Sequence, residues 1–238
     1  MNTIIIRPIQ PEDNTQIAAV IRQVFIDDDF PKTGTAFADA QLDFMFETYN
    51  KSKAIYFVVE TDGKIIGGAG ISQLENSKEN ICELQKMYFL QEARGKGIGF
   101  KLIEKCLEKA IEFGYSSCYL ETLPEMKAAQ NLYNKFGFEY LCSPLGNTGH
   151  TTCPVLMIKD LIIENVTTTG VSVNVHFIPM PMLTVFKDRG YKIANYPMAY
   201  NNYAREISLP IYPQLTNEEV DYICDSILSS YQKVINND

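Results

Sequence analysis

The stretch of sequence that decides the fold reads Glu83-Leu-Gln-Lys-Met-Tyr-Phe-Leu-Gln-Glu-Ala-Arg94-Gly95-Lys96-Gly97-Ile98-Gly99. Its first half has the composition of a strand, and its second half is a glycine-rich turn. The turn leads into a helix whose apolar residues recur at helical spacing. Glycines let the backbone approach an anion closely, while outward N–H groups and the start of a helix add positive potential. The turn therefore predicts a cradle for a diphosphate.

Glycine-rich turns before helices also open Rossmann dinucleotide sites and Walker-type nucleotide sites. The turn at 94–99 contains neither a GxGxxG pattern nor a Gly-Lys-Ser/Thr triplet, and it follows an internal strand rather than the first one. Both alternatives are disfavoured. The remaining alternative from the turn alone is an ordinary strand-to-helix connection.

The hydrophobic spacing of the surrounding chain predicts a mixed α/β layout. The Asp62-Gly63 pair indicates a tight hairpin turn, and Gly114 and Gly137 mark the ends of helices. Strands are expected near residues 4–7, 54–60, 64–74, 81–90, 115–122 and 155–161, and helices near 17–25, 42–49, 102–111 and 127–136.

Composition excludes several classes of protein. The chain has 238 residues, 46% hydrophobic content and a formal net charge of −8, which suits a folded core and argues against a nucleic-acid partner. Its six cysteines are scattered without metal-ligand spacing, so no metal is expected and they indicate reduced, buried thiols. Neither a signal sequence nor a membrane span is indicated, which predicts a cytoplasmic protein.

The turn resembles the pyrophosphate loop of the GNAT N-acetyltransferase superfamily, whose pattern Gln/Arg-x-x-Gly-x-Gly/Ala is met by Arg94, Gly97 and Gly99. The resemblance covers about residues 3–161. It includes 83–89 as the family's fourth strand, which implies a bulged backbone near Met87 and Phe89. It also includes 120–138 as the family's fifth strand, next helix and Leu-Tyr-x-Lys-x-Gly-Phe signature. It implies an α/β (α+β) fold with a central mixed, mostly antiparallel sheet flanked by helices.

The resemblance also implies acetyl-CoA as cosubstrate. Many family members carry Asn where this chain has Met126, so one hydrogen bond to the cofactor is expected to be lost or replaced by packing. The implied cofactor-binding residues are Met87, Tyr88, Phe89, Arg94, Gly95, Lys96, Gly97, Ile98, Gly99 and Met126.

An amine that arrives as an ammonium ion, with a pKa of about 10, must lose a proton to a base before it is acetylated. The reaction also needs a hydrogen-bond donor for the oxyanion and a proton for the departing thiolate. By resemblance, Glu83 is the base, a backbone N–H within 87–89 is the donor, and Tyr133 is the acid. For Glu83 the alternatives are to face solvent or to pair with Lys86 or Lys101, and for Tyr133 the alternative is a core tyrosine. The acidic run 27–29 is a substrate-side candidate, while His150 is expected to be a solvated loop residue.

The last 70 or so residues change in character. The stretches 170–180 and 205–220 resemble the end of PLP-dependent aminotransferases that act on nucleotide sugars. The PLP lysine of that family lies in its large domain, which this chain lacks, so no PLP is expected, and His176 and Arg205 receive no catalytic role. A final helix is predicted from Asn217, capped by Thr216 and Glu219, with an inner face of Val220, Ile223, Ile227 and Leu228.

These observations predict a GNAT domain at 1–162 and a small aminotransferase-like segment at 163–238. The predicted function is acetyl transfer from acetyl-CoA to a primary amine on a small molecule, with amino sugars among the candidates, by direct attack in a ternary complex. The alternative is a non-catalytic CoA-binding or scaffold protein that associates through its tail. A homodimer formed through the tail is a further expectation.

Overall fold

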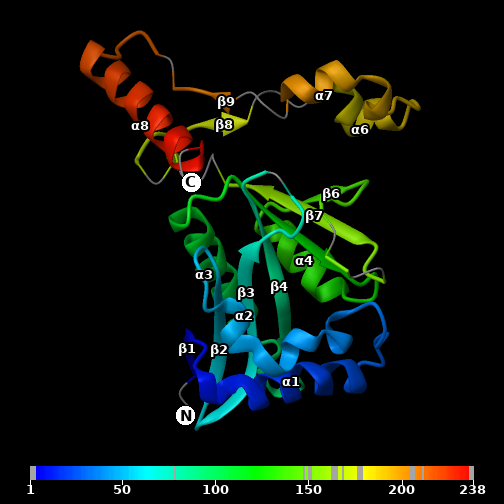
Figure 1. Cartoon of the computed structure of the whole chain (residues 1–238). Helices are drawn as coiled ribbons and strands as arrows, with labels where there is room; N and C mark the ends of the chain where they lie inside the picture. The colour runs from blue at the N-terminus through cyan, green and yellow to red at the C-terminus, as the bar shows by residue number, and fades with distance from the viewer. Residues whose placement is uncertain are drawn as a thin grey trace. The chain divides into compact units, whose positions relative to one another are not determined.

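The computed structural model describes residues 4–235 except 78, 147, 150–151, 162–165, 168, 176–178, 204–206 and 211. His150, His176 and Arg205 therefore lie outside the described residues. The chain divides into two compact units after Leu161 (Figure 1).

The first unit is built on a sheet with strand order β1-β2-β3-β4-β5-β7-β6. Its strands are β1 (Ile4–Pro8), β2 (Ile55–Thr61), β3 (Lys64–Gln73), β4 (Ile81–Phe89), β5 (Ser117–Thr122), β6 (Glu139–Leu141) and β7 (Val155–Asp160). Only the β4–β5 pair is parallel, and all other neighbours in this sheet are antiparallel. The predicted mixed, mostly antiparallel sheet is confirmed.

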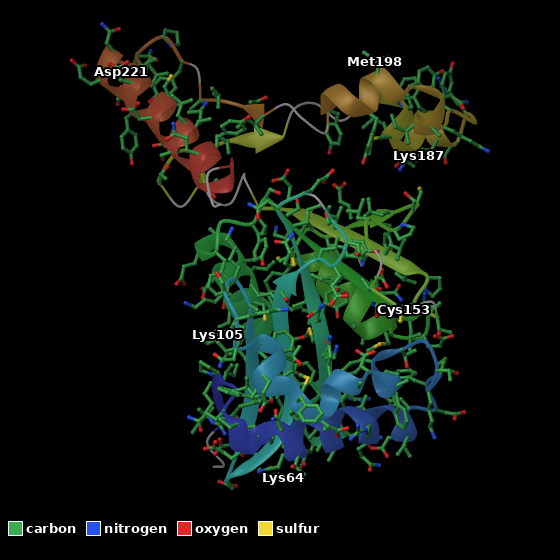
Figure 2. The ribbon with its side chains drawn as sticks, in the orientation of Figure 1. Lys64, Lys105, Cys153, Lys187, Met198 and Asp221 are labelled. Atoms are coloured by element: carbon green, nitrogen blue, oxygen red, sulfur yellow. The ribbon has the colours of Figure 1, made fainter. Side chains whose placement is uncertain are left out.

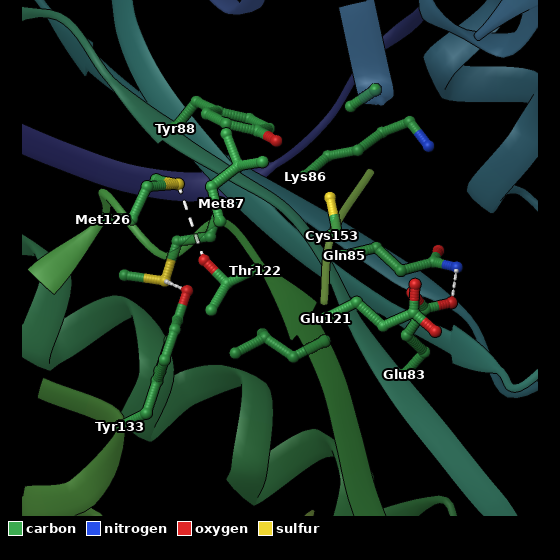
Figure 3. Close-up of a pocket in the computed structure, with 13 residues that line it drawn as sticks. Glu83, Gln85, Lys86, Met87, Tyr88, Glu121, Thr122, Met126, Tyr133 and Cys153 are labelled. Atoms are coloured by element: carbon green, nitrogen blue, oxygen red, sulfur yellow. Dashed lines mark hydrogen bonds between the residues drawn. The ribbon is translucent and has the colours of Figure 1, made fainter. Parts of the chain in front are cut away.

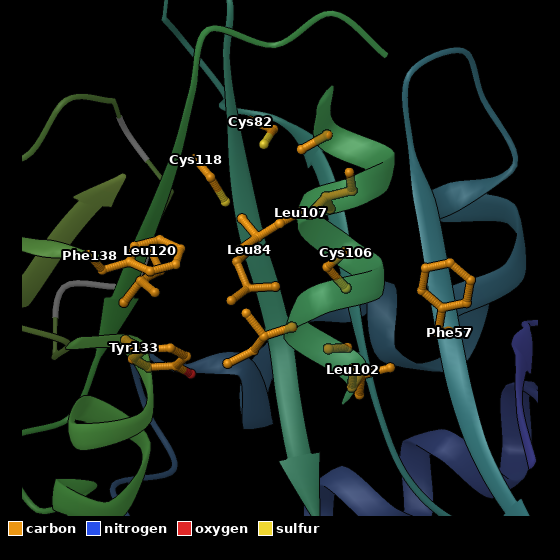
Figure 4. Packing of buried hydrophobic residues seen from close by; sticks show 14 of the residues in the cluster. Phe57, Cys82, Leu84, Leu102, Cys106, Leu107, Cys118, Leu120, Tyr133 and Phe138 are labelled. Atoms are coloured by element: carbon orange, nitrogen blue, oxygen red, sulfur yellow. The ribbon is translucent and has the colours of Figure 1, made fainter. Parts of the chain in front are cut away.

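Helices cover both faces of the sheet. One face packs against α1 (Asn14–Asp27) and α2 (Met45–Tyr49), and the other packs against α3 (Ile98–Glu112) and α4 (Lys127–Lys135). Short 3₁₀ turns lie at 11–13, 36–38, 40–44 and 91–93. Figure 2 shows side chains filling the space between these layers, and Figure 4 shows Tyr133 in the same apolar cluster as Leu84 and Leu102.

Local sequence explains the connections. Asp62 and Gly63 both have positive φ (50° and 77°), so the predicted two-residue hairpin joins β2 to β3. Gly114 (φ 78°) follows α3, and Tyr115 N–H bonds the Ala110 carbonyl at 3.0 Å, which closes the helix end as expected. The short strand β6 was not predicted, because three residues are too few to show a period.

The second unit contains the two-stranded pair β8 (Asn174–Val175) and β9 (Ile207–Ser208) and the helices α6 (Thr184–Lys187), α7 (Pro197–Tyr203) and α8 (Asn217–Ile235). The predicted cap of α8 is present, because Thr216 N–H donates to Glu219 at 2.9 Å and Glu219 N–H donates to Thr216 at 3.2 Å. Its predicted inner face is half wrong.

Only part of that predicted face is covered. Ile223 is buried and Ile227 packs beside it, whereas Val220 and Leu228 are 42% and 55% exposed. The buried cluster of this unit is small, consisting of Val166, Val171, Val173 and Ile223 among the described residues. A unit with so few buried side chains leaves little apolar surface for the rest of α8 to cover.

The cysteine prediction needs a correction. Cys82, Cys106 and Cys118 are buried, whereas Cys142 and Cys224 are exposed and Cys153 is half-buried. All six are free thiols, but only half of them are buried. Within the part of the chain that the structure describes, no helix combines the length and apolar character needed to cross a membrane.

Asp13 ties the first strand to α1 and should be a pH-dependent element of stability. Its buried carboxylate accepts bonds from both terminal Arg7 nitrogens (2.6 and 2.9 Å) and from Gln10 N–H (2.7 Å). Burial alone would raise the pKa of Asp13, but these bonds outweigh it and lower the pKa below its usual value. This stabilisation is present above about pH 4 and is lost as the pH falls through the lowered folded-state pKa.

We therefore expect Asp13→Asn to lower the free energy of unfolding by about 2 kcal/mol at pH 7. The difference from the wild type should shrink below about pH 4, as measured by urea unfolding at both pH values. Asp43→Asn is the matched control, because exposed Asp43 also pairs with an arginine and should cost much less. Equal losses in the two variants would contradict this account.

Candidate functional site

The site forms where β4 and β5 separate. The two strands pair in parallel only from Ile81 and Ser117 to Glu83 and Tyr119. Beyond that point β4 continues against β3, and β5 continues against β7. The separation leaves space between the carboxyl-terminal halves of two neighbouring parallel strands.

A β-bulge in β4 borders this space. Gly70 pairs with Gln85 and Gly68 pairs with Tyr88, so one residue of β3 opposes both Lys86 and Met87. Lys86 has a φ of 51°, which lysine rarely adopts. The resemblance placed the bulge near Met87 and Phe89, but Phe89 is back in register with Gly67, so the irregularity is confined to Lys86 and Met87.

The bulge changes which side chains face which side of the sheet. Before it, Leu84 packs with the α3 face, while Gln85 bonds Tyr49 of α2 on the opposite face. After it, Met87 packs with the α3 face and Tyr88 packs with the α1 face. Without the inserted residue, strict alternation would put Met87 on the same face as Glu83. The bulge therefore presents Glu83 and Met87 from opposite faces.

The glycine-rich turn leads into the N-terminus of α3. Gly95 and Gly97 both have a φ of 73°, and Gly97 is the residue that caps the helix. The N–H groups of the first turn have no partner inside a helix and point outward, where they suit an anion. The diphosphate cradle at this turn stays a prediction.

A wide groove of about 620 Å³ runs along this turn. Among the predicted cofactor-binding residues, those lining the groove are Met87, Tyr88, Phe89, Arg94, Gly95, Gly97, Ile98, Gly99 and Met126. Lys96 is exposed and does not line it. A Cβ on Gly99 would lie 3.1 Å from Leu132 and 3.3 Å from Met87, so glycine keeps the groove open there.

Arg94 is held by a carboxylate at the groove. Its guanidinium donates to both oxygens of Asp28 (2.6 and 3.1 Å) and to the Phe89 carbonyl (3.0 Å). Asp28 also lines the groove. The acidic run 27–29, expected on the substrate side, therefore contributes Asp28 to the side of the glycine-rich turn.

A narrow cavity of about 30 Å³ lies between β4 and β5, and both predicted catalytic residues line it (Figure 3). Tyr133 reaches it from α4 beside Met87 and Met126, and Glu83 reaches it from β4 beside Glu121 and Gln85. Tyr133 and Glu83 thus occupy opposite ends of the group of lining side chains.

Tyr133 is a buried phenol with a weak acceptor. It is 5% exposed, and its hydroxyl donates to the Met87 sulfur at 3.8 Å. Burial raises the pKa of Tyr133 above its usual value, with smaller contributions from Cys118 and Cys106. At neutral pH the phenol therefore carries its proton at the edge of the cavity.

Glu83 is a buried carboxylate on the other side. It is 3% exposed, and one oxygen accepts a bond from Gln85 Nε2 at 2.7 Å. Gln85 is itself fixed by the Tyr49 hydroxyl, which donates to Gln85 Oε1 at 2.8 Å. The side-chain amide therefore orients the carboxylate. Lys86, one of the predicted alternative partners of Glu83, pairs with Asp39 at 2.7 Å.

A third, acidic cavity of about 220 Å³ adjoins the narrow one and shares Glu83, Gln85 and Lys86 with it. Its other lining residues are Asp39, Ala40, Gln41, Glu75 and Thr148. Thr148 donates to Glu121 of the narrow cavity at 2.7 Å. Carboxylates outnumber the cation Lys86 around the two cavities, an environment that favours a positively charged ligand.

Several of these residues were not singled out from the sequence. Glu121 is fixed by Tyr119, whose hydroxyl donates to it at 2.7 Å. Asp39 lies in the loop between α1 and α2, and Cys153 lies just before β7. These residues come from segments distant in sequence, so no local motif marks them. The only available signal for Glu121 was its place near the end of a strand.

Cys153 lines the narrow cavity but is a poor nucleophile. Burial raises the pKa of its thiol to about 12, and the nearby carboxylates Glu121, Glu83 and Asp39 add to the effect. The thiolate is the reactive form of cysteine, so at neutral pH this side chain is almost wholly the unreactive thiol.

Two family profiles match the chain. Residues 19–138, just over half of the chain, match the "Acetyltransferase (GNAT) family", and residues 149–228 match the "DegT/DnrJ/EryC1/StrS aminotransferase family". The second match begins ahead of β7, so it overlaps the end of the first compact unit. Both predicted resemblances are confirmed.

Curated relatives match both parts. The chain is 43% identical over 158 residues to the "Uncharacterized N-acetyltransferase YjgM" of Escherichia coli, which covers 66% of this chain and 95% of that protein. It is 38% identical over 59 residues to the "Spore coat polysaccharide biosynthesis protein SpsC" of Bacillus subtilis. That match covers 24% of this chain and only 15% of SpsC.

Solved structures confirm the predicted fold. A GNAT-family acetyltransferase from Staphylococcus aureus Mu50 superposes with a TM-score of 0.61 at 20% identity, over 67% of this chain and 99% of that one. A phosphinothricin acetyltransferase from Sinorhizobium meliloti, solved in complex with AcCoA, superposes with a TM-score of 0.55 at 22% identity. The latter match covers 67% of this chain and 89% of that one.

The environment of Tyr133 leads to a prediction about its ionisation. Because burial raises its pKa, the Tyr133 phenol should stay protonated beyond about pH 10, the usual pKa of tyrosine. Carbon-13 NMR of tyrosine labelled at Cζ measures this, with the Tyr133 signal assigned through the Tyr133→Phe variant. A signal that moves to the phenolate position with a midpoint at or below pH 10 would show that the phenol is not held as described.

Proposed function

Because the chain belongs to the GNAT acetyltransferase family, we propose that it transfers the acetyl group of acetyl-CoA to a primary amine within a ternary complex. The observation that carries this proposal is the continuity of three cavities. The narrow cavity shares Met87, Tyr88 and Met126 with the wide groove, and it shares Glu83, Gln85 and Lys86 with the acidic cavity. A thioester and an amine entering from the two sides would meet between Tyr133 and Glu83.

The wide groove suits acetyl-CoA in size and chemistry. Its volume lies within the ordinary range of ligand sites, about 300–1,000 Å³, and apolar side chains such as Met87, Phe89 and Leu132 line it. At one end the amides from Gly95 to Gly99 and the start of α3 would hold the diphosphate. Met126 packs at the groove and donates no hydrogen bond from its side chain, which supports the expected replacement of a polar contact.

The acidic cavity suits the acceptor. An alkylamine arrives mainly as an ammonium ion at neutral pH, and carboxylates favour its entry. Glu83 would then take one proton, directly or through a water molecule, to free the nitrogen lone pair. The tail's match to a protein of polysaccharide biosynthesis supports including amino sugars among the acceptors to be tested.

The transfer itself balances in three events. The amine nitrogen bonds to the acetyl carbon, the carbon–sulfur bond breaks, and the nitrogen loses its remaining extra proton. Of the two protons that the ammonium ion gives up, one makes up for the proton that the sulfur takes, and the other leaves Glu83 for solvent. A backbone N–H at the bulge would stabilise the negative oxygen of the tetrahedral intermediate. Tyr133, neutral and beside Met87, would donate its proton or a hydrogen bond to the departing sulfur.

Direct transfer is supported over an acyl-cysteine intermediate. Cys153 is the cysteine in the lining of the narrow cavity, and its raised pKa of about 12 leaves almost no thiolate at neutral pH. A covalent route through this residue would need a base that removes the thiol proton, and its neighbouring carboxylates make ionisation harder.

The second candidate function is a non-catalytic CoA-binding scaffold. The aminotransferase match over residues 149–228 favours it. The match to SpsC covers only 15% of that protein, so the segment would depend on a separate aminotransferase for any such activity. Under this alternative the chain would bind acetyl-CoA and associate through residues 163–238 with an aminotransferase. For the enzyme, the same segment, following an acetyltransferase domain at 1–162, would serve to form a homodimer or to shape the substrate site.

A thiol-release assay separates the two functions. Acetyl-CoA is supplied with a panel of diamines, amino sugars, amino acids and peptide N-termini, and free CoA is measured with a thiol reagent. Acetyl transfer predicts release that depends on one class of amine and an acetylated product by mass spectrometry. Tight acetyl-CoA binding without release on any acceptor would favour the scaffold and contradict the enzyme.

The glycine turn gives a prediction for binding. Gly97→Ala forces an alanine into a φ of 73° and puts a methyl group at the proposed diphosphate site, so CoA affinity should fall at least tenfold by calorimetry. Gly63→Ala is the matched control, because Gly63 has a φ of 77° and equally open surroundings but lies in the β2–β3 hairpin. Equal CoA affinities in the two variants would contradict the cradle.

The catalytic assignments give a second prediction. Tyr133→Phe and Glu83→Gln should each lower kcat by about 10²-fold or more while CoA binding changes little. Cys153→Ser should retain kcat within about twofold, because the thiol takes no part in direct transfer. Loss of activity in Cys153→Ser, with acetylated Cys153 in the wild-type enzyme after acetyl-CoA alone, would overturn the direct mechanism.

A further inference from the structure

Tyr56 is a fully buried tyrosine on β2 whose hydroxyl reaches β4, two strands away in the sheet. The hydroxyl donates to the backbone carbonyl of Lys86 at 2.8 Å. Lys86 is the bulge residue with positive φ, and the register gives it no paired residue in β3. A side chain from a distant strand therefore satisfies the irregular backbone group.

The intervening strand β3 is shaped to let the tyrosine ring pass. A Cβ on Gly68 would lie 2.6 Å from Tyr56 Cε1 and 2.8 Å from its hydroxyl oxygen. A Cβ on Gly70 would lie 2.6 Å from Tyr56 Cδ2. No side chain fits at such distances, so the glycines of β3 provide the path along which Tyr56 reaches the bulge.

The bond also sets the direction of the next amide. The chain has no cis peptide bond among its described residues, so the Lys86 carbonyl and the Met87 N–H point in opposite directions. Tyr56 draws the carbonyl toward β3, and β5 lies on the other side of β4. The Met87 N–H therefore points away from β3, toward the side on which the narrow cavity separates β4 from β5.

We infer that Tyr56 is a positioning residue for acetyl transfer: its hydroxyl fixes the Lys86–Met87 peptide so that the Met87 N–H faces the acetyl oxygen. The inference rests on the proposed function, because it assigns a role to the donor at the bulge. Tyr56 lines none of the three cavities, so it would act through the Lys86 backbone carbonyl. This role also accounts for the Tyr56 hydroxyl being buried within a hydrophobic cluster.

Tyr56→Phe removes the hydroxyl and keeps the ring that fills the glycine path. The infrared stretching band of the carbonyl of bound acetyl-CoA, labelled with carbon-13 at that carbonyl, should lie at lower frequency in the wild type than in the variant, because a well-aimed N–H polarises the thioester. The kcat of the variant should fall about tenfold or more, since loss of an oxyanion donor costs about 10²–10³. Affinity for CoA, which lacks the carbonyl, should stay within twofold.

Tyr115→Phe is the matched control, because the Tyr115 hydroxyl also donates to a lysine carbonyl (Lys53, 2.7 Å) elsewhere in the first unit. Both variants should lower the melting temperature by a similar amount, but Tyr115→Phe should leave the carbonyl band and kcat unchanged. An unchanged band and kcat in Tyr56→Phe, or equal effects in Tyr115→Phe, overturn the inference while leaving the proposed function intact. Absence of acetyl-CoA binding in the wild type overturns both.

A measurement on the wild-type protein keeps the test decisive if Tyr56→Phe does not fold. With methionine labelled with nitrogen-15, the Met87 amide proton should move downfield when acetyl-CoA replaces CoA, because only acetyl-CoA offers the carbonyl acceptor. The other methionine amides serve as internal references. A Met87 amide with the same shift in both complexes overturns the inference.

Discussion

The interrupted contact between β4 and β5 is the constraint on which the site depends. These neighbouring strands are parallel, pair over a short segment and then separate, while each stays paired with its other neighbour. The sheet is therefore continuous at one end and split at the other. Every residue to which we assign chemistry lies along that split, and the helix that begins at the glycine-rich turn lies at its side.

The bulge at Lys86 determines which side chains of β4 border the space between β4 and β5. One inserted residue changes the alternation of β4, so that Met87 faces the α3 side and Glu83 the opposite side. The strained backbone is held by the Tyr56 hydroxyl and by close packing across the glycines of β3. The acidic cavity is thus lined by Glu83 before a single irregularity in the pairing of β4, and the binding groove is lined by Met87 at that irregularity.

The sequence was informative wherever the chemistry depends on consecutive residues. Gly95 and Gly97 adopt the positive φ that only glycine accepts readily, and the spacing from Tyr133 to Gly137 fixes a helix and its end. The position of the bulge, the pairing of Arg94 with Asp28 and the exposure of Lys96 depend on contacts between distant segments. Local periodicity contains no information about such contacts, which is why Glu121 and Tyr56 were not singled out.

In the second unit the helical period of α8 was predicted correctly, but the surface that covers it was not. A helical period shows which face is apolar without showing what packs against that face.

The central claim is that acetyl-CoA lies in the groove beside the glycine-rich turn, with its thioester between β4 and β5. A crystal structure of the protein with CoA bound tests this most directly. The account predicts the diphosphate against the amides from Gly95 to Gly99 and the thiol between Met87 and Tyr133. CoA bound elsewhere on the chain, or a groove left empty at saturating CoA, would contradict it.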